Sequence, residues 1–131
     1  MLPGDPAAPR KDNFKYMVES LNELGPILDR YQAHLIIEGW PGPGALCCTP
    51  ETYRAAIKAC NSKSIGINFD PSHLLRMHID PIRFVDEFAD RIYHVHGKDT
   101  EILRENIYEY GIEQPATFGT PRAFGGMTWR Y

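Results

Sequence analysis

Residues 65–70, with the sequence IGINFD, decide the fold class of this chain. The segment is a nearly continuous apolar run that ends on an acid, which is typical of a strand covered on both faces of a sheet. Residues 34–38 (HLIIE) and residues 92–96 (IYHVH) share this pattern. The three segments begin 31 and 27 residues apart, a spacing that suits repeated βα units. We therefore predict one strand in each segment.

The stretches between these strands have the apolar periodicity of helices. Thr49 followed by Pro50 marks the start of one helix, because threonine caps helices and proline is accepted in the first turn. Asp80 followed by Pro81 marks the start of another. A helix between each pair of strands implies that the strands are parallel and that the helices pack outside them. The sequence thus predicts an α/β fold.

A further helix is expected before the first strand, with Asp12 or Asn13 as its cap. Gly25-Pro26 should kink or break this helix, because proline lacks the hydrogen-bond donor that a helix needs. After the third strand, one or two helical turns are expected within residues 103–110. The single domain is divided into a leading loop, the βα units and a loop-rich tail, at residues 1–11, 12–100 and 101–131.

Composition and charge exclude several classes of protein. The net charge of −3 argues against an electrostatic nucleic-acid binder, which normally shows a basic face. No stretch approaches the ~20 apolar residues of a membrane helix, and the proline-rich start has no signal-peptide core. The three cysteines, Cys47, Cys48 and Cys60, form no CxxC pattern and are expected to be free thiols in a reducing, cytoplasmic compartment.

Each predicted strand ends on a polar residue: Glu38, Asp70 and His96. In a closed βα barrel the carboxyl ends of the strands meet at one mouth, where active sites are built. Two carboxylates brought together need a cation between them, since like charges otherwise destabilise the site. Carboxylate and imidazole ligands suit Mn²⁺, Co²⁺, Zn²⁺ or Mg²⁺. The alternative for an aspartate such as Asp70 is a structural role as a loop or helix cap.

Three neighbours of these residues each have a functional and a structural interpretation. His94 lies on the same face of its strand as the residue two positions later, so it either supports the metal site or is an interior, hydrogen-bonded histidine. Lys98 either holds a substrate oxygen or pairs with a carboxylate such as Asp99, which is a further supporting candidate. Trp40 either stacks on a sugar or anchors its loop.

The same segments carry a family resemblance. HLIIEG, INFDPSHLL and IYHVHGKDT resemble the fifth to seventh strands of the sugar phosphate isomerase/epimerase superfamily, the xylose isomerase-like TIM barrels. The Asp-x-x-His of residues 70–73 and the His-x-Lys-Asp of residues 96–99 are its more specific parts. The resemblance implies that Glu38, Asp70 and His96 bind a divalent metal ion. It also implies that His73 contacts the substrate, and that a glutamate on an eighth strand completes the site.

The resemblance implies an enzyme of carbohydrate metabolism, an isomerase or epimerase of sugars or sugar phosphates. Glu38 would act as ligand and base in proton transfer through a metal-stabilised enediolate. The small-molecule partner would be a sugar, and the complete protein could form a homo-oligomer. Two alternatives stay open: an inactive or metal-binding half-barrel, and an apurinic-site endonuclease. The endonuclease needs further histidines, whereas none follows His96.

The length of the chain is compared with that of a complete barrel. A closed barrel of this kind takes ~250 residues, so 131 residues would hold about half of one. We therefore expect a partial barrel, truncated at both ends, with open sheet edges. Such a chain is expected to be poorly stable and inactive by itself.

Overall fold

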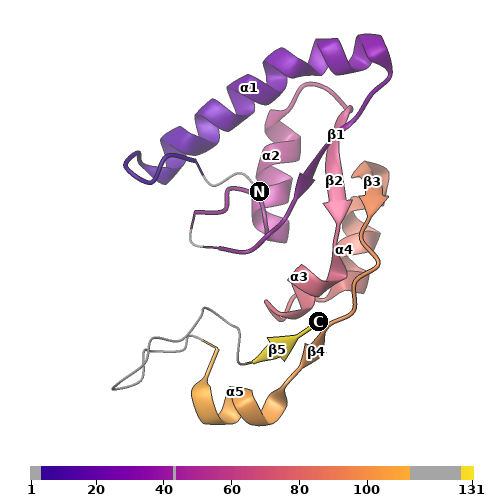
Figure 1. Cartoon of the computed structure of the whole chain (residues 1–131). Coiled ribbons are helices and arrows are strands. Elements are labelled where there is room, and N and C mark those ends of the chain that lie inside the picture. The colour runs from indigo at the N-terminus through magenta and orange to yellow at the C-terminus, as the bar shows by residue number, and fades with distance from the viewer. Residues whose placement is uncertain (1–3, 43, 113–127) are drawn as a thin grey trace.

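The computed structural model describes residues 4–42, 44–112 and 128–131. Its main sheet has three parallel strands in the order β1 (Leu35–Glu38), β2 (Ile65–Phe69) and β3 (Ile92–Val95) (Figure 1). The register pairs Glu38 with Asn68, and it shifts by one residue between Ile67 and Asn68 where β2 meets β3. The three strands and their parallel direction confirm the prediction of an α/β fold.

The helices lie between and around these strands. They are α1 (Arg10–Tyr31), α2 (Pro50–Ala59), α3 (Pro71–Leu75), α4 (Pro81–Phe88), the 3-10 turn η1 (Ala89–Arg91) and α5 (Arg104–Tyr110). Beyond β3, two short strands, β4 (Glu101–Ile102) and β5 (Trp129–Arg130), form an antiparallel pair. Across the described ranges, no helix is both long enough and apolar enough to cross a membrane. The predicted tail therefore contains the expected helical turns and also an unpredicted strand pair, while residues 113–127 lie outside the described part.

Of the kink or break predicted at Gly25-Pro26, the break is wrong, because α1 runs through both residues, and the kink stays a prediction. Proline inside a helix loses one hydrogen bond, but the part of its steric clash that involves the Cβ of the preceding residue is absent here, because that residue is glycine. Gly25 is also buried, and a Cβ there would come within 2.8 Å of the Ser62 Cβ. The predicted cap is wrong too, since Pro9 takes that position and Asn13 instead bonds to the backbone of Asp5.

The other two predicted helix starts are confirmed. Thr49 caps α2 by accepting a hydrogen bond from the backbone N–H of Thr52, whose hydroxyl in turn accepts from Thr49 N–H. Asp80 caps α4 by accepting from the N–H groups of Ile82 and Arg83. These caps determine the residue at which α2 and α4 begin.

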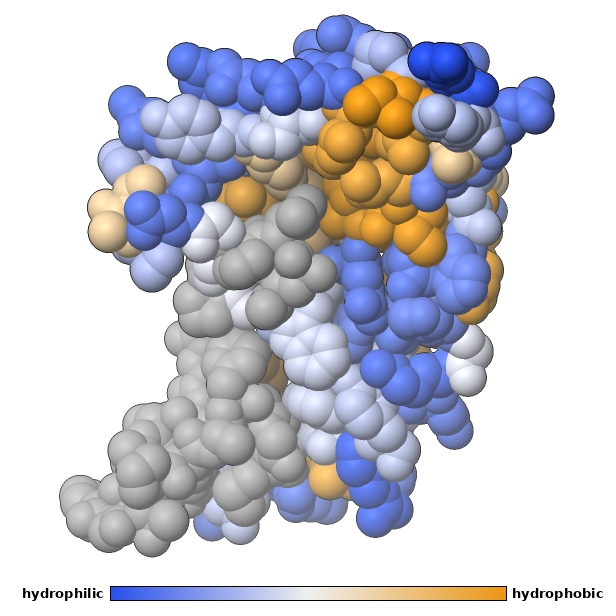
Figure 2. Space-filling view, turned by 45° about the horizontal axis from the view of Figure 1, so that its top comes forward, coloured by the Kyte–Doolittle hydropathy of each residue, from blue (hydrophilic) through white to orange (hydrophobic). Residues whose placement is uncertain are grey.

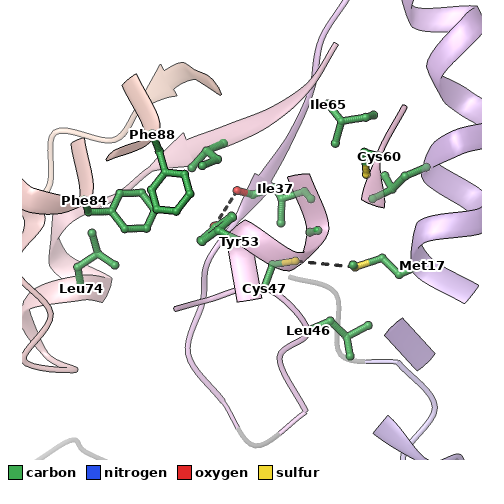
Figure 3. Packing of buried hydrophobic residues seen from close by; sticks show 13 residues of the cluster. Met17, Ile37, Leu46, Cys47, Tyr53, Cys60, Ile65, Leu74, Phe84 and Phe88 are labelled. Atoms are coloured by element: carbon green, nitrogen blue, oxygen red, sulfur yellow. Dashed lines mark hydrogen bonds between the residues drawn. The ribbon is translucent and has the colours of Figure 1, made fainter. Parts of the chain in front are cut away.

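The core lies between the sheet and the helices (Figure 3). Tyr53 on α2 is 2% exposed and donates its hydroxyl proton to the Ile37 carbonyl of β1 at 3.1 Å. Its ring meets Phe84 of α4 edge to face, with 5.5 Å between the centroids. The three cysteines are free thiols, as predicted, and all three are buried, which raises the pKa of Cys47 to about 12. Cys47 is thus a packing residue, in contact with Met17.

Part of the sheet is exposed to solvent and not covered by helices. On β3, the side chains of Tyr93 and Val95 are 38% and 56% exposed. Figure 2 shows a contiguous apolar area beside α1, whereas most of the remaining described surface in that view is polar. The three parallel strands described here are fewer than the eight that close a TIM barrel.

The close approach of β2 and β3 depends on Gly66. A Cβ at this position would lie 2.3 Å from the Tyr93 ring and 2.7 Å from the Arg91 carbonyl oxygen. We expect Gly66→Ala to lower the unfolding free energy by ~1–3 kcal/mol, as overpacking of a core usually does. Gly42→Ala is the control, because no described residue lies within 4 Å of a Cβ there. Urea unfolding of both variants checks this, and equal stabilities would contradict it.

Candidate metal centre

The carboxyl ends of the three parallel strands bring Glu38, Asp70 and His96 together. Nδ1 of His96 lies 3.4 Å from Oε1 of Glu38 and 3.6 Å from Oδ2 of Asp70. The residues come from β1, from the end of β2 and from the end of β3, so the sheet itself sets their spacing. The predicted meeting of these side chains at one edge of the sheet is thus what the structure shows.

Asp70 has a different neighbour at each carboxylate oxygen. Its Oδ1 accepts hydrogen bonds from the backbone N–H and the hydroxyl of Ser72, which makes Asp70 the N-cap of α3. Its Oδ2 is buried and accepts no hydrogen bond of good geometry within the described residues. Instead, this oxygen faces nitrogens of His73, His96 and Lys98 at 3.3, 3.6 and 3.2 Å. Asp70 is therefore a helix cap through one oxygen and a candidate ligand through the other.

The short helix α3, which the sequence analysis did not predict, places His73 inside the cluster. Its Nε2 lies 3.3 Å from Oδ2 of Asp70 and 3.4 Å from Oε1 of Glu38. The donor atoms of Glu38, Asp70 and His73 all lie within 4.8 Å of one another. His73 is only 1% exposed. We expected this residue to contact the substrate, whereas its position makes it a further candidate ligand.

The electrostatics favour the protonation states that bind a cation. Burial alone would raise the pKa of Asp70, but the Ser72 hydrogen bond and the charges of His73 and Lys98 outweigh it and leave the pKa below its ordinary value. Burial lowers the pKa of His73 and outweighs the attraction of Asp70. An ionised carboxylate and a neutral imidazole are the forms that coordinate metal ions. The oxygen of Asp70 without a hydrogen bond and this donor set fit a divalent ion.

Asn68 on β2, which the sequence analysis did not single out, links the two histidines of the third strand. Its Oδ1 accepts from Nδ1 of His94 at 3.0 Å, and its Nδ2 lies 3.2 Å from Nδ1 and 3.3 Å from Nε2 of His96. The rings of His94 and His96 meet edge to face at 5.3 Å, on one face as predicted. His94 is exposed and touches the cluster through Asn68. It is therefore not the interior histidine of the alternative interpretation.

The remaining predicted residues differ in their distance from the cluster. Lys98 pairs with Asp70, with 3.2 Å between Nζ and Oδ2, rather than with Asp99. The carboxylate of Asp99 accepts from the N–H of Thr100, and the structure gives it no contact with the cluster among the described residues. The Trp40 ring is 41% exposed and meets His73 edge to face, with 4.8 Å between the centroids. Lys98 and Trp40 thus border the cluster, and Asp99 does not.

Arg76 and the end of the chain also reach this region. The guanidinium of Arg76 lies over the rings of both Trp40 and Trp129, with its carbon 4.7 and 4.6 Å from the centroids. Its Nη1 donates to the hydroxyl of Tyr131 at 3.3 Å. One feature of the sequence indicates that Arg76 is near the cluster. It follows His73 by three residues, about one helical turn, and is the C-cap of α3. Nothing in the sequence indicates that β5 returns here.

Comparison with known proteins identifies the family. Residues 1–125 match the family described as xylose isomerase-like TIM barrel. The chain belongs to this family. The xylose isomerase-like TIM barrels include isomerases and epimerases as well as endonucleases. The resemblance noted in the sequence is thus confirmed at the level of the family.

A curated relative of this TIM-barrel chain is the uncharacterized protein YfiH of Bacillus subtilis (strain 168). The two are 55% identical over 40 residues, which is 30% of this chain and 13% of YfiH. The aligned part therefore spans about an eighth of the relative, whose printed name gives no activity.

Proposed function

We propose that this chain carries the metal centre of a sugar isomerase or epimerase, which moves a proton at a carbon next to a carbonyl. One observation above all supports this proposal: two carboxylates and two histidines converge at the strand ends around a buried oxygen of Asp70 that accepts no hydrogen bond of good geometry among the described residues. Active sites of TIM barrels are built at this end of the strands.

Glu38, Asp70 and His96 would hold the ion, and His73 is placed to join them. Mn²⁺, Co²⁺, Mg²⁺ and Zn²⁺ all suit oxygen and imidazole donors, so the donor set does not select one of them. When bound, the ion supplies Lewis-acid polarisation of the substrate carbonyl. We further place the three strands as the fifth to seventh of the barrel, with a glutamate of another strand completing the site, as the family resemblance implies.

The exposure of the two carboxylates separates their roles. The side chain of Glu38 is 34% exposed, so it is accessible to a substrate, whereas that of Asp70 is 1% exposed. A base must come within hydrogen-bond reach of the proton that it accepts, which favours Glu38. Lys98, with its side chain 34% exposed, would donate to a substrate oxygen, and the exposed ring of Trp40 would pack on the sugar. Asp70 stays a ligand.

Two features favour isomerase over endonuclease chemistry within this family. The net charge is −3, and a phosphodiester backbone is normally met by a basic surface. Among the described residues the cluster has two histidines, His73 and His96, whereas a cluster of several zinc ions needs additional histidines. We also propose a cytoplasmic location, in keeping with three free, buried cysteines.

The proposal is tested by incubating the complete protein, which includes the further strand that completes the site, with ketoses and ketose phosphates in heavy water. Proton transfer at the carbon next to the carbonyl is expected to put deuterium there, to stop after treatment with a chelator and to return with added Mn²⁺ or Co²⁺. Exchange that persists without metal would overturn the proposal. Metal binding with no exchange on any of these substrates would favour the metal-binding half-barrel instead.

A further inference from the structure

Arg76 lies against two aromatic rings and forms no salt bridge among the described residues, although the charge of Asp70 acts on it from a greater distance. Its guanidinium carbon lies over two rings, 4.7 Å from the centroid of Trp40 and 4.6 Å from that of Trp129. In the part of the chain that the structure describes, its buried Nε has no hydrogen-bond partner, and its Nη1 donates to the Tyr131 hydroxyl at 3.3 Å. A guanidinium stacked on an aromatic ring still has its N–H groups free along its edge. These N–H groups point in parallel and form a fork of hydrogen-bond donors. The fork matches planar carboxylates and phosphates.

Lys98 shares the aromatic surroundings of Arg76. Its Nζ lies 4.2 Å from the ring centroid of Tyr131 and 5.9 Å from that of Trp40. The same ammonium is 3.2 Å from Oδ2 of Asp70, the oxygen that faces the candidate metal ligands. The two cations therefore border one region, which lies beside the metal cluster and is walled by Trp40 and Tyr131.

The charges of this region indicate the sign of the charge that a ligand must carry. Glu38 and Asp70 carry two negative charges, and Lys98 and Arg76 carry two positive charges. A divalent ion on the carboxylates adds two more positive charges and competes with Lys98 for Asp70. Even a further glutamate ligand, which the family resemblance implies, would leave an excess of one positive charge. Unpaired charges of one sign in a half-buried site are costly unless an anion joins them.

We propose that Arg76 and Lys98 form an oxyanion subsite beside the metal, so that the substrate is a polyhydroxy compound with a carboxylate or a phosphate ester. This inference rests on the proposed function, of which it specifies the substrate class. The Arg76 fork accounts for recognition of the oxyanion, and Lys98 moves to it when the metal takes Oδ2 of Asp70. Trp40 and Tyr131 close the sides of the subsite.

The test uses the tryptophan fluorescence of the whole chain, because its two tryptophans, Trp40 and Trp129, are the two that stack on Arg76. The Mg²⁺-loaded protein is titrated with inorganic phosphate, with glycolate and with neutral erythritol at constant ionic strength. We expect phosphate or glycolate to change the emission saturably, the tighter of the two indicating the oxyanion of the substrate. Erythritol should bind at least ~10-fold more weakly, given the strength of charge-assisted hydrogen bonds.

Variants then assign the binding to the guanidinium. Arg76→Met and Arg76→Lys should both weaken anion binding at least ~10-fold, since the first removes the charge and the second the fork. Arg83→Met, on the exposed side of α4, is the matched control and should bind as the wild type does. Calorimetric Mg²⁺ binding is measured on every variant, and it should be unchanged.

The outcomes separate this inference from the proposed function. If Mg²⁺ binds but neither anion does, or if Arg76→Met binds both anions as tightly as wild type, the oxyanion subsite is wrong while the metal centre stands. Equal binding of erythritol and the anions overturns it too. If Mg²⁺ itself does not bind, the proposed function fails first.

Discussion

Replacing Glu38 with glutamine in the complete protein is expected to lower kcat by ~10²–10⁴-fold while some of the metal ion is retained. This range is what a positioned general base usually contributes. A glutamine oxygen can still coordinate a cation, but it does not accept a proton from carbon. Because Oε1 of Glu38 lies 3.4 Å from both His73 and His96, the amide fits the same place without new contacts. The substitution therefore removes the base, while the neutral amide oxygen retains weaker coordination, so that metal is still bound at a saturating concentration.

Metal content per chain, measured beside kcat on the same preparation, checks this expectation. Glu51→Gln is the control, because Glu51 is an exposed glutamate in the first turn of α2 and should change neither quantity. A nearly normal kcat in Glu38→Gln would show that another residue is the base. A variant that loses both turnover and metal would leave Glu38 as a ligand alone.

Asp70→Asn is expected to weaken Mn²⁺ binding by at least ~100-fold with little loss of stability. Loss of residues that merely support a metal ligand already costs 10–100-fold in affinity, so loss of a charged ligand should cost more. Asparagine keeps an oxygen that can accept from the N–H of Ser72, so the cap of α3 survives. Asp70→Ala should remove both the metal ligand and the cap of α3, and its unfolding free energy should be ~0.5–2 kcal/mol below that of Asp70→Asn.

The matched control for this experiment is Asp80→Asn, because Asp80 caps α4 in the same manner and lies outside the cluster. Calorimetric titration with Mn²⁺ gives the affinity, and thermal melting of the metal-free variants gives the stability. If Asp70→Asn and Asp80→Asn bind Mn²⁺ equally well, Asp70 is a helix cap and nothing more.

The sequence predicted those parts of the fold and the site that depend on the order of neighbouring residues. The strands are apolar runs that each end on a polar residue, and parallel strands place all three ends at one edge of the sheet. The positions of Glu38, Asp70 and His96 therefore followed from the periodicity alone. The helix caps Thr49 and Asp80 were predictable for a similar reason, because capping is a local property of three or four residues.

The features that escaped prediction depend on contacts between distant segments. Gly25, next to Pro26 inside α1, packs closely against Ser62, a contact with a distant segment that no local pattern reveals. The five residues of α3 are too few for a periodic signal, so the position of His73 within the cluster was not foreseen. Arg76 gains its role from the two tryptophans, 36 and 53 residues away in sequence.

The central claim is that the strand ends form one divalent metal site, and Co²⁺ titration of the metal-free chain followed by visible absorption tests it most directly. The account predicts d–d bands that saturate at one Co²⁺ per chain, with a spectrum that changes in His96→Ala because an imidazole nitrogen leaves the coordination sphere. A titration without saturable bands, or a spectrum unaltered by loss of His96, would contradict the account.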